Sequence, residues 1–145
     1  MNNDKTLYTS LALAGVLPFV ACALLPLFGV ISVEPFGRLD QLANSYGLAI
    51  VCFLAGIHWS TYLLRQDQLP FNLMIGSNVV FLATWFMFIL ADTAWSLLTQ
   101  CAALIVLLLI DWRLKNAAII NASYLQTRFI ATTIASMALV LIALT

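Results

Sequence analysis

Residues 94–110 read AWSLLTQCAALIVLLLI and contain no charged side chain. At about 1.5 Å per residue, a helix of this length approaches the roughly 30 Å thickness of the hydrocarbon core of a bilayer. A helix of a soluble domain would instead be amphipathic, with apolar residues on one face only. The stretch therefore predicts a transmembrane helix.

The rest of the chain repeats this pattern. Six basic and six acidic residues occur among 145, and 63% of the residues are hydrophobic, whereas a soluble domain has about a quarter charged residues. Most of the charges fall in short gaps between apolar stretches, and such gaps can only join neighbouring helices. We predict an all-α polytopic membrane protein, a compact bundle that forms a single domain over residues 1–145. The five predicted transmembrane helices are residues 7–31, 43–64, 70–90, 94–110 and 124–144.

The basic residues predict the orientation of these spans. With five spans, one side of the membrane receives the N-terminus and the loops after the second and fourth spans. That side carries five basic residues against only Arg38 on the other, and basic residues favour the cytoplasm. We therefore expect a cytoplasmic N-terminus, a periplasmic C-terminus and, without a transit peptide, a bacterial inner membrane. The five basic residues are Lys5, Arg65, Arg113, Lys115 and Arg128.

Two prolines interrupt the first span. Pro18 and Pro26 each remove a backbone hydrogen bond, which frees the carbonyls of Ala14 and Cys22. We expect a bent helix, and an alternative is that the freed carbonyls line a polar cavity. Small residues recur at four-residue spacing in two other spans, where we expect contacts between helices. These residues are Cys52, Gly56 and Ser60 in the second span and Thr132 and Ser136 in the fifth.

Polar side chains at the cytoplasmic ends of three spans form the candidate site. His58 lies about two turns inside the second span, Asp111 is predicted to close the fourth, and Tyr124 and Arg128 open the fifth on one face. We expect these four residues to converge. The secondary candidates share these helix ends or lie deeper in the membrane, and they are Trp59, Tyr62, Arg65, Asn78, Gln100 and Thr132.

The cluster has two interpretations. In the first, Arg128 snorkels to the headgroups, Asp111 caps its helix at the interface, and His58 is hydrogen-bonded within the bundle. In the second, the three groups surround a site for an anionic headgroup, a quinone or a proton, where an imidazole can titrate near neutrality. Asn78 is expected to make a hydrogen bond between helices.

A short motif carries a resemblance to a known family. Residues 53–59 read FLAGIHW, and the Gly-x-His-Trp element is the most specific part. The chain resembles, over nearly its whole length, the family grouped as domain of unknown function 3429, which includes relatives of mitochondrial transmembrane protein 69. The resemblance implies a small multi-pass membrane protein and brings no established activity. The other residues that carry it are Pro18, Phe19, Asp111, Tyr124 and Arg128, while Ser60 and Ser123 depart from the expected pattern.

The sequence lacks the residues that several classes of function require. His58 is the only histidine, so the sequence predicts no metal site, no bis-histidine haem and no other cofactor. Phosphate-binding glycine loops, serine nucleophile elbows and basic nucleic-acid surfaces are missing as well, and an enzyme is the less favoured class. Three unpaired cysteines, Cys22, Cys52 and Cys101, are interpreted as packing residues.

Two functions remain for this chain in the bilayer. We favour a noncatalytic accessory or assembly subunit that packs against a larger membrane complex or another membrane protein. The alternative is a small transporter or carrier that uses His58, Asp111 and Arg128 as a proton-linked, anion or quinone site. The sequence also leaves open a homo-oligomer.

The predicted orientation can be tested with reporter fusions. A reporter fused after Thr145 should be active only in the periplasm, and one inserted after Arg113 only in the cytoplasm, because of the bias in basic residues. The opposite pattern at either position would contradict the five-span topology.

Overall fold

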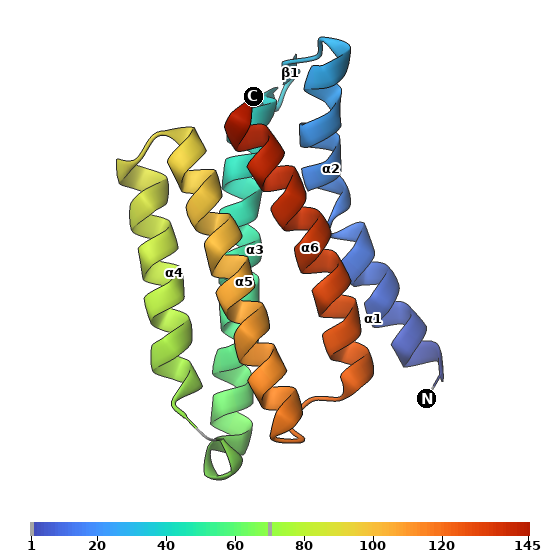
Figure 1. The fold of residues 1–145 in the computed structure, drawn as a ribbon, viewed down its shortest axis with the longest axis vertical. Coiled ribbons are helices and arrows are strands. Elements are labelled where there is room, and N and C mark those ends of the chain that lie inside the picture. The colour runs from blue at the N-terminus through green and yellow to red at the C-terminus, as the bar shows by residue number, and fades with distance from the viewer. Residues whose placement is uncertain (1, 70) are drawn as a thin grey trace.

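The computed structural model describes residues 2–69 and 71–145, with side chains from Thr6 onward. Pro70, the expected start of the third span, and the side chain of Lys5 lie outside this description. Five helical segments are long and apolar enough to cross a membrane, as the sequence predicted, and Figure 1 shows them side by side in one bundle. They are Thr6–Phe28, Leu39–Gln68, Leu73–Leu90, Thr93–Asn116 and Ala122–Leu144.

The first span is broken next to Pro18. Helix α1 (Asn2–Ala14) ends before Gly15, and α2 (Leu17–Leu24) has Pro18 in its first turn, where a missing N–H costs no helical hydrogen bond. The hydroxyl of Tyr46 donates to the carbonyl of Gly15 over 2.8 Å, so a side chain satisfies backbone at the break. Figure 1 shows α1 inclined away from the line of α2. Pro26 lies in a final 3-10 turn, η1 (Leu25–Phe28).

A short hairpin follows, which the sequence analysis did not predict. Strands β1 (Ser32–Val33) and β2 (Gly37–Arg38) pair antiparallel, and Gly37 has a φ of 82°. Two-residue strands are too short to give an alternating sequence pattern. Helix α3 (Leu39–Arg65) then begins four residues before the predicted Ala43, and Arg38 forms an ion pair with Asp40 in its first turn.

The remaining elements are η2 (Gln66–Gln68), α4 (Leu73–Leu90), α5 (Thr93–Asn116) and α6 (Ala122–Leu144). The N-termini of α4, α5 and α6 are capped by the side chains of Asn72, Asp92 and Asn121. Each side chain accepts a hydrogen bond from the backbone N–H of the residue three positions later. The prediction that α5 ends at Asp111 was wrong, because α5 continues to Asn116. Charged residues after Asp111 mark the membrane boundary, but they do not break a helix.

The apolar core lies between α2, α3, α5 and α6. Phe19, Val51, Leu104 and Leu139 are almost fully buried there. By contrast, Cys52, Gly56 and Ser60 are exposed on α3, so the contacts between helices expected of this stripe are not buried within the bundle. Spacing shows which residues share a helix face, but it does not show which face meets the neighbouring helices.

A polar contact joins α3 to α5 deep in the bundle. The side-chain amide of the fully buried Gln100 donates to the carbonyl of Asn44 over 2.9 Å and to Asn44 Oδ1 over 2.7 Å. Ser96 Oγ also donates to Asn44 Oδ1, over 2.7 Å. A Cβ atom at Gly47 would collide with the side-chain carbonyl of Gln100. A glycine at position 47 therefore permits this close approach.

A pair of glycine substitutions on α3 tests this packing. Gly47→Ala should lower the free energy of unfolding by about 1–3 kcal/mol, because the new methyl group must displace Gln100. Gly56→Ala is the matched control, since nothing lies within 4 Å of its added Cβ. Thermal unfolding in detergent should separate the two variants. Equal stability would contradict the contact.

Candidate functional site

A buried carboxylate joins three helices. Asp111 of α5 accepts a hydrogen bond at Oδ1 from His58 Nε2 of α3 over 2.8 Å. Its Oδ2 accepts from Arg128 Nε of α6 over 3.0 Å. The three side chains are here called the triad. They lie near the C-terminal ends of α3 and α5 and near the start of α6, and Figure 1 shows these helix ends at the end of the bundle that holds the N-terminus.

All three members of the triad are withdrawn from the surface. The exposed fractions are 2% for His58, 3% for Asp111 and 8% for Arg128. An uncompensated charge is costly in such surroundings, so each charge needs its partner. The interpretation in which Arg128 snorkels and Asp111 caps a helix at the interface is therefore wrong. Both residues point into the bundle because each neutralises the other.

The triad leaves polar atoms with no partner. Among the described residues, Arg128 Nη2 and His58 Nδ1 are buried and make no hydrogen bond. Thr132 Oγ1, one helical turn beyond Arg128 on α6, is also buried and unpartnered. Buried polar atoms of this kind are uncommon, and a bound ligand is one way to satisfy them. The arrangement offers hydrogen-bond donors from Arg128 and Thr132.

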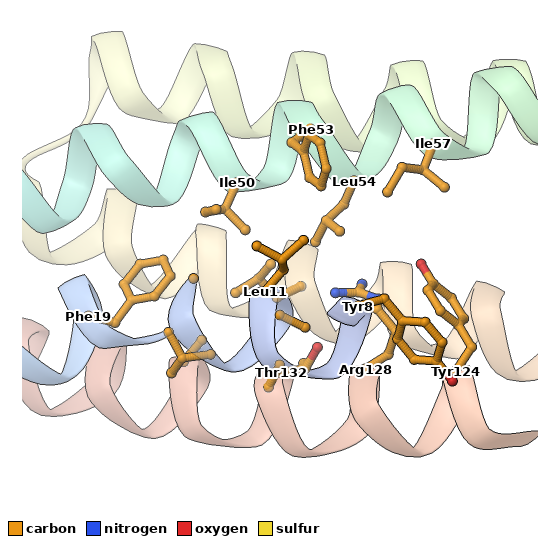
Figure 2. A pocket seen from close by; sticks show the side chains of 16 residues that line it. Tyr8, Leu11, Phe19, Ile50, Phe53, Leu54, Ile57, Tyr124, Arg128 and Thr132 are labelled. Carbon is orange, nitrogen blue, oxygen red and sulfur yellow. The ribbon is translucent and has the colours of Figure 1, made fainter. Parts of the chain in front are cut away.

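These two donors line an apolar groove of about 380 Å³ between α1, α3 and α6. Figure 2 shows Ile50, Phe53 and other α3 side chains facing Leu11 of α1, with Arg128 and Thr132 rising from α6. Among the side chains that the structure describes, Arg128 is the only charged one that lines the groove. The groove therefore combines a long apolar surface with polar groups near one end.

A second cavity, of about 440 Å³, also adjoins the triad. His58 and Asp111 line it, together with residues of the α5–α6 connection such as Asn121. Both cavities are also lined by Tyr8, Ile57 and Tyr124. Members of the triad therefore line both cavities, Arg128 the groove and His58 and Asp111 the second cavity.

Two residues of α1 complete the site, and the sequence analysis missed them. The hydroxyls of Tyr8 and Ser123 are hydrogen-bonded over 2.6 Å, and the Tyr8 ring meets that of Tyr124 edge to face with centroids 6.1 Å apart. Ala12 lines the groove one turn further along. The spacing of Tyr8 and Ala12 at i and i+4 was visible in the sequence, but it did not show which helix α1 would contact.

The secondary candidates fall in different places. Thr132 belongs to the groove, whereas Gln100 bonds Asn44 in the separate α3–α5 contact. Trp59 and Arg65 are exposed, and Tyr62 accepts a 3.4 Å hydrogen bond from Asn72. Asn78 forms no hydrogen bond with any described residue, so its expected bond between helices is not present there.

The ligating side chains do not gather into a metal site in the described part of the chain. No group of three or more His, Cys, Asp or Glu residues there could hold a metal ion. Cys22 and Cys101 are buried as expected for packing residues, while Cys52 is exposed on α3.

The fold and the triad together define the class of the protein. It is a small multi-pass membrane protein, a bundle of five helices long and apolar enough to span a bilayer, with an ionic cluster buried among three of them. Residues 5–144 match the family described as "Protein of unknown function (DUF3429)", and the chain belongs to that family. Neither a curated protein nor a solved structure matches the chain.

Removing one charge of the triad should be more harmful than removing both. Asp111→Leu leaves the Arg128 charge buried alone and should cost about 3–5 kcal/mol of stability. The double variant Asp111→Leu/Arg128→Met removes both charges and should recover most of that loss. The free energies of unfolding of Asp111→Leu, Arg128→Met and the double variant give the coupling energy between the two side chains. Additive losses would contradict the ion pair.

Proposed function

We propose that this protein binds an amphipathic molecule from the bilayer and carries or presents it, with the groove at Arg128 as its site. The observation that carries the proposal is that Arg128 lines an otherwise apolar groove while its Nη2 is buried without a partner among the described residues. No chemical reaction is part of the proposal.

The position of the groove supports entry from the lipid phase. Leu11 and Phe53, which line it on α1 and α3, are 64% and 66% exposed. In a membrane these side chains would contact acyl chains, so an apolar tail can enter sideways between α1 and α3. The volume of about 380 Å³ falls in the range of small-molecule sites.

The head of such a molecule would lie near the triad. Arg128 Nη2 and Thr132 Oγ1 offer donors on one face of α6, and Tyr124 lines the same groove. Asp111 holds the Arg128 guanidinium through Nε, which fixes the direction of its free edge. A preoriented donor loses little entropy when a ligand binds. The triad would therefore position the ligand head.

The orientation belongs to the same proposal. Arg65, Arg113 and Lys115 are exposed in the last turns of α3 and α5, and these two helices finish at the end of the bundle that holds the N-terminus (Figure 1). Basic residues at one end favour a cytoplasmic location for it, in a bacterial inner membrane with the C-terminus in the periplasm. The second cavity would then open toward the cytoplasm.

The accessory role is the second candidate function. Cys52, Gly56 and Trp59 of α3 and Asn78 of α4 line a shallow groove on the outer face of the bundle. An amide without a partner is costly in contact with lipid, and a helix of another chain could satisfy Asn78 there. This surface supports packing against a larger complex or a second copy.

Purification of matched variants tests the ligand-binding proposal. Ala12→Phe fills the groove, whereas Ala14→Phe adds the same ring two residues away at an exposed position that does not line it. Mass spectrometry of extracts should find an amphipathic molecule with the wild type and Ala14→Phe, and at least tenfold less with Ala12→Phe.

Equal amounts in all three samples would contradict the proposal. The accessory role predicts a different result, in which a stoichiometric protein partner co-purifies with Ala12→Phe and is lost when Gly56→Leu blocks the outer groove.

A further inference from the structure

We infer that the ligand of the groove has an uncharged head with carbonyl oxygens, of the chemical class of lipid-soluble quinones, and that the groove discriminates against anionic amphiphiles. This inference rests on the proposed function and names the substrate class of that site. It follows from the charges, the donors and the lining of the groove.

The charge balance of the triad favours an uncharged head. The positive charge of Arg128 is already matched by Asp111 at 3.0 Å, and no other charged residue lines the groove among the side chains that the structure describes, from Thr6 onward. A carboxylate or phosphate head would bring a second negative charge to the guanidinium that Asp111 already neutralises. Such a charge is unfavourable at membrane depth. A carbonyl oxygen accepts the same hydrogen bond without adding a charge.

The unpartnered atoms favour a head with more than one acceptor. Arg128 Nη2 and Thr132 Oγ1 are both buried, both lack a partner among the described residues, and lie one turn apart on the same face of α6. A quinone ring carries two carbonyl oxygens and no strong donor. It can therefore accept from both Arg128 and Thr132, and the Tyr124 hydroxyl, which forms no hydrogen bond in the described chain, belongs to a residue that lines the same groove.

The shape and lining of the groove suit a flat ring with an apolar tail. Tyr8 and Tyr124 lie beside the Arg128 end, and Phe19 and Phe53 lie further along (Figure 2). Aromatic side chains pack against flat rings in offset or edge-to-face geometry. The tail would follow the apolar residues toward the exposed side chains of Leu11 and Phe53. Binding alone is inferred, with no electron or proton transfer.

Binding of soluble probes to the protein in phosphatidylcholine nanodiscs tests the inference. The probes are decylubiquinone, which has the carbonyl ring, and oleate, which has an anionic head. Thr132→Val removes the groove hydroxyl and keeps the side-chain shape. Thr133→Val is the matched control, because Thr133 is exposed and bonds only the Phe129 carbonyl.

Decylubiquinone should bind the wild type at least tenfold more tightly than oleate. Thr132→Val should weaken the binding of decylubiquinone about three- to tenfold, as expected for the loss of one hydrogen bond. Thr133→Val should leave this binding unchanged. Ala12→Phe should abolish binding of decylubiquinone.

Other results would overturn the inference in distinguishable ways. If oleate binds more tightly and Ala12→Phe abolishes its binding, the ligand is anionic and the proposed function stands. If only phospholipid occupies the groove and decylubiquinone does not displace it, the quinone class is excluded. If Ala12→Phe changes the binding of neither probe, both the inference and the proposed function fail.

Discussion

The carboxylate of Asp111 is the group on which the arrangement of the bundle depends. It lies inside α5 and accepts one hydrogen bond from α3 and one from α6, so a single side chain fixes the relative positions of three helices. In a low-dielectric interior such a group is tolerated only when it is paired. The pairing also determines which edge of the Arg128 guanidinium remains free. Structural stability and the proposed binding therefore have the same origin.

The two buried polar networks of the protein differ in what surrounds them. Gln100 packs tightly against Gly47, and it lines neither the groove nor the cavity beneath the triad. The triad, by contrast, adjoins two cavities, and the free atoms of Arg128 and His58 belong to residues that line them. The first network is suited to holding α3 against α5. The second is suited to holding a ligand as well, and this contrast separates a structural role from the proposed function.

Much of the fold could be predicted from the sequence, because apolar length and charge placement directly reflect the bilayer. The five spans follow from these features, and His58, Asp111 and Arg128 could be assigned to one membrane level from helix geometry alone. The sequence could not predict the outward orientation of Gly56 or the role of Tyr8, because both depend on how the helices are rotated and on which helices are neighbours. The end of α5 was misplaced because Asp111 was interpreted as an interfacial residue, whereas its partners stabilise it within the helix.

The most direct test of the account is magic-angle-spinning NMR of the protein in lipid bilayers, with isotope-labelled arginine and aspartate. The measurement is the through-space contact between the Asp111 carboxylate carbon and the Arg128 guanidinium, followed while decylubiquinone is added. We predict that the contact is present throughout, and that the Arg128 Nη resonances shift with the quinone while the Nε resonance, bound to Asp111, stays in place. An absent contact, or Nη resonances that do not respond, would contradict the central claim that Asp111 holds Arg128 with its free edge toward a ligand.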